Sequence, residues 1–218
     1  MFQRHNSVEL IGVYGSDETH ALSAWTSTSR ELTEEKQARI PKLLKMLADN
    51  GHETPFEKSS LHFLVTCDIA SHIHLLKHRV GVSINAESAR YKELNDDKYY
   101  VPLDWDPHEV DLYTQHAEEC LRRYHETLDR LVSKGTSRKR AKESARFYLP
   151  YGNQITADVM FNFRSFNHFL RLRYSVHAQV EIRKIAEDML RLVHGTGAFK
   201  HTLESFGLTV GGNVREPF

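Results

Sequence analysis

Apolar residues stand at every second position from Ile155 to Phe163 within the segment Gln154 to Arg164, and this pattern restricts the fold more than any other. A period of two residues predicts a strand with one buried and one polar face. Helical spacing of apolar residues follows over 165–173 and 178–194. Because strand and helix patterns are interleaved without a linker or repeat, we expect one α+β domain spanning 1–218. In it, a small, mostly antiparallel sheet packs against several helices.

The remaining segments carry recognisable start and stop signals. Strands are expected at 8–15 and 60–69, and helices are expected over 33–50, 70–79, 107–135 and from 137 to just before Pro150. Thr33 and Asp106 are the expected N-caps, and Pro41 indicates either a kink or the true first turn of its helix. The helix over 70–79 would place His74 and His78 one turn apart.

Composition excludes several classes of protein. The 218 residues include 29 Lys or Arg and 29 Asp or Glu, so the formal net charge is zero. A balanced charge argues against non-specific binding to nucleic acid or to a membrane surface. The sequence contains no run of about 18 apolar residues that would predict a membrane span. Its N-terminus lacks the apolar core of a secretory signal. Cys67 and Cys120 lie far apart, so we expect no disulfide framework and a reducing, cytoplasmic setting.

Residues 77–91 combine cations with small hydrogen-bonding side chains, as phosphate-binding segments do. Arg and Lys bind phosphate oxygens, and Ser hydroxyls and backbone amides complete such a site. The segment therefore predicts a site for a phosphorylated ligand. Its polar members are Lys77, His78, Arg79, Ser83, Asn85, Ser88 and Arg90.

Two other polar groups have both a structural and a functional interpretation. Asn162 and Arg164 share the polar face of the predicted strand, and His168 and Arg173 follow on the next helix. Together they favour a site and a solvated surface about equally. In the run from Gly51 to Glu57, Thr54 is an expected N-cap and Glu57 completes a capping box, whereas His52 and Glu53 have no such explanation.

The motifs of several enzyme classes are missing. The sequence contains no phosphate loop, no dinucleotide fingerprint and no nucleophile elbow, and neither cysteine has a context that would activate it. His74 and His78 have a ligand spacing, but no Glu completes a zinc-hydrolase pattern, so we expect no metal. The basic run 137–142 has no aromatic residues to stack on bases. These residues alone indicate a phosphate-binding site without a covalent nucleophile.

Three ordered motifs resemble those of the flavin-dependent thymidylate synthase family along almost the whole chain. The first is Gly-His-Glu-Thr-Pro-Phe-Glu at 51–57. The second is Lys-His-Arg at 77–79, followed by Ser-x-Asn-x-x-Ser-x-Arg-Tyr at 83–91. The third extends from Asn162 to Ile182 and contains Asn-x-Arg-Ser and His-Ala-Gln-x-Glu-Ile. The family pattern has Arg where this chain has Lys77, has a spacer one residue shorter before Ser83, and has an acidic or amide residue at the place of Ala86.

The resemblance implies a reaction that the residues alone do not specify. Deoxyuridylate (dUMP) would receive a methylene group from methylenetetrahydrofolate and a hydride from reduced FAD, giving thymidylate (dTMP), and NADPH would reduce the flavin again. It also implies a homotetramer with active sites between subunits, and flavin chemistry in place of a nucleophilic cysteine. The alternatives are a flavin- or nucleotide-binding homologue with lost or altered catalysis, and a nucleic-acid-binding protein that uses the basic run.

The resemblance also assigns roles to individual residues. Arg173 would be catalytic and would contact the uracil ring, where its guanidinium favours the N3-deprotonated form. FAD would contact Thr54, Glu57, Lys77, His78, Arg79, Asn162, Arg164 and His168. The substrates would contact Ser88, Ala89, Arg90, Arg146 and Arg173, with His74 and Glu87 nearby and His52 on the folate side.

Overall fold

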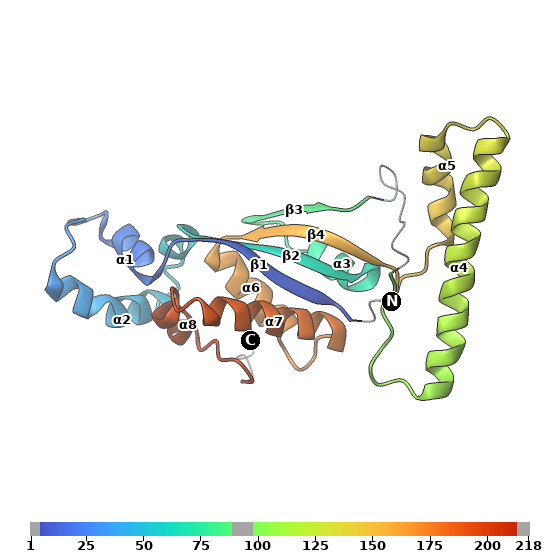
Figure 1. The fold of residues 1–218 in the computed structure, drawn as a ribbon. Helices are drawn as coiled ribbons and strands as arrows, with labels where there is room; N and C mark the ends of the chain where they lie inside the picture. The colour runs from blue at the N-terminus through green and yellow to red at the C-terminus, as the bar shows by residue number, and fades with distance from the viewer. Residues whose placement is uncertain (1–4, 89–97, 213–218) are drawn as a thin grey trace. The chain divides into compact units, whose positions relative to one another are not determined.

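The computed structural model describes residues 5–88 and 98–212, and its backbone contacts divide the chain into two compact units (Figure 1). Unit 1 consists of Met1–Ser7, Thr66–Leu75 and Asn85–Ala157, and unit 2 consists of Val8–Val65, Leu76–Ile84 and Asp158–Phe218. Within the described residues, the strands form one four-stranded sheet in the order β1-β2-β4-β3. Their bounds are β1 Ser7–Tyr14, β2 Ser60–Asp68, β3 Val82–Ala86 and β4 Gln154–Phe161.

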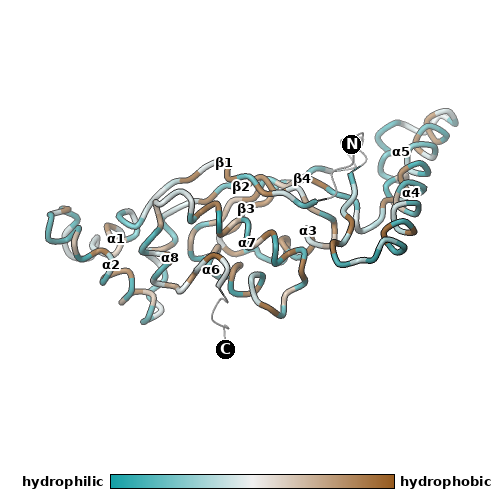
Figure 2. Tube along the Cα trace, turned by 60° about the horizontal axis from the view of Figure 1, so that its bottom comes forward, coloured by the Kyte–Doolittle hydropathy of each residue, from teal (hydrophilic) through white to brown (hydrophobic). Residues whose placement is uncertain are grey.

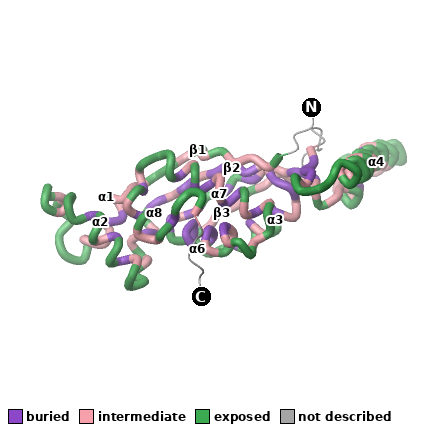
Figure 3. Tube along the Cα trace, turned by 90° about the horizontal axis from the view of Figure 1, so that it is seen from below, coloured by how far each residue is buried: buried purple, intermediate pink, exposed green. Residues whose placement is uncertain are grey.

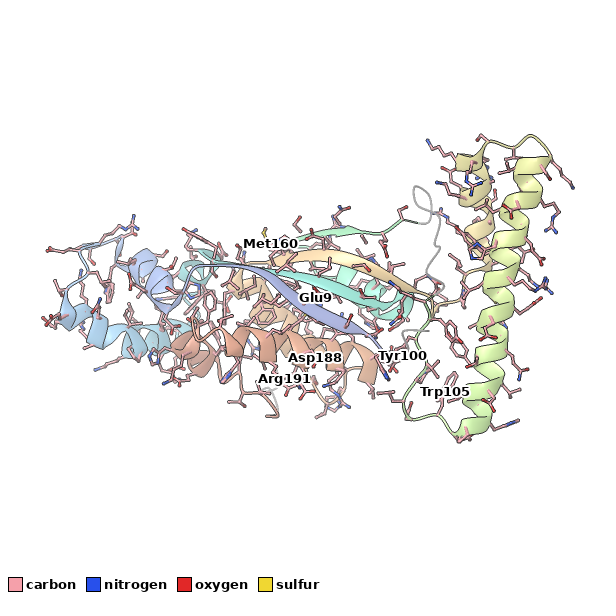
Figure 4. The ribbon with its side chains drawn as sticks, in the orientation of Figure 1. Glu9, Tyr100, Trp105, Met160, Asp188 and Arg191 are labelled. Atoms are coloured by element: carbon pink, nitrogen blue, oxygen red, sulfur yellow. The ribbon has the colours of Figure 1, made fainter. Side chains whose placement is uncertain are left out.

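In unit 2, the described helices cover one face of the sheet and leave the other face open. The helices are α1 Asp17–Trp25, α2 Glu34–Asp49, η1 Thr54–Glu57, α6 Phe163–Arg173, α7 Val180–Gly195 and α8 Lys200–Phe206. Figure 1 shows α6 and α7 beneath the strands, and Figure 4 shows Met160 pointing to the opposite side. His62 and Asp158 pair on that open face. On the outer side of α7, Asp188 Oδ1 accepts a hydrogen bond from Arg191 Nη1 at 2.6 Å (Figure 4).

Aromatic side chains fill the core of unit 2. Figure 3 shows buried residues in purple along β2 and α6. The alternation in the sequence produces this core, because Phe63 and Phe161 project from the covered face of neighbouring strands and meet the apolar side of α6. Phe63 stacks on Phe166 with ring centroids 5.7 Å apart. Burying each such side chain stabilises the fold by about 1.5–3 kcal/mol. The fully buried rings are Phe56, Phe63, Phe161, Phe163, Phe166, Phe169 and Phe199.

One polar chain of hydrogen bonds crosses this aromatic core. Thr202 Oγ1 donates its hydrogen to Asp17 Oδ1 at 2.7 Å, so it can only accept from His20 Nδ1, which lies 3.0 Å away. His20 Nε2 is then the acceptor for the Ser59 hydroxyl at 2.9 Å. His20 is therefore a neutral imidazole with its proton on Nδ1, and it joins α1 to α8 and to the start of β2.

Burial makes the stability of unit 2 sensitive to acid at His20. Desolvation lowers the pKa of His20 from 6.5 to about 4. Below pH 6.5 the unfolded chain binds a proton that the folded chain does not bind until about pH 4, so stability falls as the pH falls through this range. We expect this residue to contribute a loss of about 2 kcal/mol between pH 7 and pH 5. Denaturant titrations of the wild type and of His20→Gln at both pH values isolate the contribution, and an equal loss in both proteins would contradict it.

Unit 1 contains the helical hairpin that the sequence predicts. Its main elements are α3 Ile69–Leu76, α4 Pro107–Ser133, α5 Arg138–Ala145 and η2 Arg146–Tyr148. Asp106 caps α4 by accepting from the backbone amides of His108 and Glu109 at 2.8 and 3.1 Å. Hydrophobic residues recur along α4 among hydrophilic ones (Figure 2), and Tyr124 and Leu128 pack against Ala141 and Ala145 of α5.

The structure corrects several boundaries predicted from the sequence. The helix expected over 70–79 ends at Leu76, so His78 lies outside it and shares no helix face with His74. The alternation predicts strand through Arg164, but β4 ends at Phe161 because the Asn162 side chain caps α6. Pro41 lies inside α2 rather than in its first turn.

Three short elements have no counterpart in the sequence prediction, namely α1, β3 and α8. Each is at most nine residues long, so its apolar pattern is too short to distinguish it from a loop. The expected α+β class with a small antiparallel sheet is confirmed. Among the described helices, none is both long enough and apolar enough to cross a membrane.

Candidate functional site

Unit 2 contains a pocket of about 570 Å³ with a strongly cationic wall. Three segments that lie far apart in the sequence build it. They are η1 with the residue before it, the turn between α3 and β3, and one side of α6. Five cations and two carboxylates line it among the described residues. Its polar and charged lining residues are Glu53, Glu57, Lys77, His78, Arg79, Asn162, Arg164, Ser165, Asn167, His168, Arg171 and Arg173.

Arg164 is held by two carboxylates from the opposite wall. Its Nε donates to Glu53 Oε2 at 2.8 Å, and its Nη1 donates to Glu57 Oε1 at 2.6 Å. The hydrogen bonds with Glu57 and Glu53 raise the pKa of Arg164, so its charge is permanent. The two ion pairs fix the plane of the guanidinium and largely neutralise it. Arg164 is therefore a rigid, compensated part of the wall.

Arg173, the last residue of α6, is held in a different way. Its Nε donates to His78 Nε2 at 3.1 Å, and no described carboxylate forms an ion pair with it. Desolvation lowers the pKa of Arg173 without bringing it near neutrality. Arg173 thus presents an uncompensated positive charge to the pocket, and both of its Nη groups remain available for an acceptor.

The turn that carries the Lys77–Arg79 segment is fastened to the start of α6. Ser165 Oγ donates to the Val80 carbonyl at 2.6 Å, and the backbone N–H of Asn162 donates to the Gly81 carbonyl at 3.2 Å. Gly81 has a φ of +64°, a conformation that glycine adopts without strain. An added Cβ there would lie 2.4 Å from both Asn162 Nδ2 and Ser165 Oγ. This turn can therefore exist only with glycine in its present form.

The pocket brings together eight of the residues predicted from the sequence. They are Glu57, Lys77, His78, Arg79, Asn162, Arg164, His168 and Arg173. The local structure around η1 differs from the expectation in two places. Thr54 is the first residue of η1 and makes no capping bond, and the Glu57 carboxylate binds Arg164 instead of closing a capping box. Asn162 uses its Oδ1 to accept the Ser165 amide at 2.8 Å.

The other predicted residues that the structure describes do not line this pocket. His52 and Thr54 are exposed residues of unit 2 next to Glu53. His74, Glu87, Ser88 and Arg146 belong to unit 1, where Glu87 accepts the backbone amide of Thr156 at 2.9 Å and Arg146 is exposed. Ala89 and Arg90 lie outside the described residues.

Glu53 and Arg171 were not predicted as site residues. Arg171 follows Arg164 and His168 by seven and three residues, so helical spacing alone places all three on one side of α6. Glu53 has no comparable signal, because its role depends on a partner 111 residues away.

A family model described as "Thymidylate synthase complementing protein" (Thy1) matches residues 9–196. A protein of Mycobacterium avium named flavin-dependent thymidylate synthase is 35% identical over 158 residues, which is 68% of this chain and 63% of that protein. A protein of the same name from Streptomyces coelicolor is 29% identical over 211 residues, which is 88% of this chain and 82% of that protein. The match thus spans less than two thirds of the mycobacterial relative.

The fold also matches a solved structure over nearly its whole length. The matching structure is that of the UMP/dUMP methylase PolB from Streptomyces cacaoi bound with 5-Br dUMP. The match has a TM-score of 0.78 and 27% sequence identity, and it covers 96% of this chain and 97% of that chain. The same enzyme bound with 5-Br UMP matches with a TM-score of 0.75 and 26% identity.

Proposed function

We propose that this chain, which belongs to the thymidylate synthase complementing protein (Thy1) family, is a flavin-dependent thymidylate synthase. It would convert dUMP to dTMP with methylenetetrahydrofolate as the carbon donor. Bound FAD would supply the hydride when reduced, and NADPH would restore its reduced form. The observation that carries the proposal is the pocket of unit 2, whose cationic wall contains Arg164, fixed and compensated by two carboxylates, and Arg173, which forms an ion pair with no described carboxylate.

The lining residues fit a flavin nucleotide. A volume of about 570 Å³ lies within the range of cofactor sites. Lys77, Arg79 and Arg171 give the positive charge that a diphosphate requires. The ring of His168 lies 5.8 Å from that of His78, so two flat side chains stand where an aromatic ring system could pack. In this assignment Glu57, Asn162 and Arg164 form the rigid part of the cofactor site, with Thr54 beside them.

Arg173 would act on the pyrimidine. Its free Nη groups can donate to the O4 and N3 side of the uracil ring, and its uncompensated charge favours loss of the N3 proton. The resulting electron-rich ring is a better nucleophile at C5, where the methylene group is added. Because the pocket holds no described carboxylate against Arg173, this electrostatic effect is not reduced by a neighbouring negative charge.

The remaining substrate contacts would come from unit 1 residues and from an assembly of four chains. Ser88, Ala89, Arg90 and Arg146 would bind the phosphate of dUMP, with His74 and Glu87 at the nucleotide and His52 on the folate side. In a homotetramer these residues can complete the pocket of another subunit. Light scattering on the purified protein should then give a mass near four times 25.3 kDa.

Turnover with a chemically reduced flavin tests the proposal directly. The purified protein is loaded with FAD, reduced with dithionite without oxygen, and mixed with dUMP and methylenetetrahydrofolate. We expect dTMP to form in an amount equal to the reduced flavin, and chromatography measures it. Flavin that stays bound while no dTMP forms would instead identify a binding homologue with lost catalysis, for which the Lys77 and Ala86 departures give a reason.

UMP is a second candidate substrate, because the matching structures are those of a UMP/dUMP methylase. A parallel reaction with UMP distinguishes the two pyrimidine nucleotides. Formation of 5-methyl-UMP at a rate comparable to that of dTMP would widen the proposed substrate class to both sugars.

A further inference from the structure

The contact between Arg173 and His78 determines which form of the imidazole can exist there. Arg173 Nε always carries a hydrogen and can only donate. His78 Nε2, 3.1 Å away, must therefore be the acceptor and cannot carry a proton. A neutral imidazole has one proton, so that proton must lie on Nδ1. An imidazolium would lose this bond and place a second positive charge beside the guanidinium.

Among the described side chains, His78 is the one acceptor that orients Arg173. A side chain as long as Arg usually keeps one position only when several partners hold it, as the two carboxylates hold Arg164. Arg173 is held instead by its hydrogen bond to the His78 side chain. His78 is itself immobilised, because only 6% of it is exposed. Its ring also packs edge-to-face with that of Phe169, with the ring centroids 5.1 Å apart.

A carboxylate in the place of His78 would hold the guanidinium more strongly but would also neutralise it. A neutral imidazole fixes the direction of Arg173 and leaves its full charge for the ligand. We propose that His78 is a positioning residue for Arg173, and that it acts only as the neutral tautomer with the proton on Nδ1. The inference deepens the proposed function, since it rests on a catalytic role for Arg173.

Among the described residues, several titratable or charged side chains lie near His78. Lys77 and Arg79 flank it in the chain, and Arg173 and His168 approach it from α6. Across the pocket, Glu53 and Glu57 are committed to Arg164. Protonation of His78 Nε2 would remove the acceptor of Arg173 and release this side chain, so turnover should decrease as the imidazole becomes charged.

Replacing His78 with Gln or Asn tests the acceptor atom at the Nε2 position separately from the imidazole ring. The oxygen of Gln is as many bonds from Cα as Nε2 is, whereas the oxygen of Asn matches only Nδ1. With saturating FAD at pH 8, we expect kcat of His78→Gln to be about tenfold higher than kcat of His78→Asn. We also expect wild-type kcat to fall about tenfold per pH unit below the imidazole pKa, and kcat of His78→Gln to stay level. Equal kcat values for the two variants, or the same acid decrease in His78→Gln, would overturn the proposal.

The tautomer can be measured without any turnover. In protein labelled with ¹⁵N-histidine, the signals missing from the His78→Gln spectrum belong to His78, and their shifts report which nitrogen carries the proton. We expect an unprotonated Nε2 at pH 8, and a proton on Nε2 at that pH would overturn the inference. If the wild type makes no dTMP, the proposed function fails, while this spectrum still decides the state of His78.

Discussion

Replacing Arg173 with Ala is expected to lower kcat about 10³-fold while bound flavin remains near one per chain. This side chain forms an ion pair with no described residue, so its removal takes away charge that the reacting pyrimidine would use. The flavin contacts proposed for Arg164, Lys77 and Arg79 do not depend on it. The absorbance of bound flavin and the rate of dTMP formation measure both expectations on one sample.

Two companion variants show which property of Arg173 matters. Arg173→Lys keeps the charge but loses the Nε donor and the paired Nη groups, so we expect most of the activity to be lost as well. Arg171→Ala removes a pocket cation two residues earlier on α6, and we expect a change of less than about tenfold, mainly in flavin affinity. Unchanged turnover in Arg173→Ala would reject the catalytic role of this side chain.

Replacing Gly81 with Ala is expected to destabilise unit 2 by about 3 kcal/mol and to reduce flavin binding. A residue with a Cβ at a φ of +64° costs about 1 kcal/mol or more. The Cβ would also displace Asn162 and Ser165 from hydrogen bonds that cap α6 and fasten the turn, at about 1 kcal/mol each. Denaturant unfolding and flavin titration measure the two effects.

Gly51 provides the matched control for this substitution. It lies in the same unit, has a φ of +66°, and an added Cβ there would meet nothing within 4 Å. Gly51→Ala should therefore cost only the backbone strain, about 1 kcal/mol. If the two variants lose the same stability, the contacts of the Gly81 turn with α6 contribute nothing, and the argument for that turn is wrong.

Local signals in the sequence predicted most of the regular structure. The caps at Thr33 and Asp106 and the apolar spacing of α4 and α7 are all confirmed, because each is decided within a few residues. The errors have tertiary causes. The helix ending at Leu76 stops before a turn that is held from α6, and β4 gives way to α6 where Asn162 supplies a cap.

The site was predicted in composition but not in arrangement. Sequence motifs identified eight pocket residues, yet they could not show that Arg164 is neutralised by Glu53 and Glu57 while Arg173 is bonded to a neutral imidazole. That difference depends on side chains brought together across long stretches of chain. A prediction from residue types alone would treat the two arginines as equivalent, although their partners give them opposite electrostatic roles.

The pocket walls come from segments around residues 53–57, 77–82 and 162–173, so no partial chain that ends before α6 contains the complete binding surface. During synthesis on the ribosome, the first two segments must wait until about three quarters of the polypeptide has been made before they can meet the third. Loop closure over such distances is slow compared with helix formation. Cofactor capture should accordingly be a late event in biogenesis, and ribosome-bound nascent chains truncated at residue 160 should fail to retain FAD.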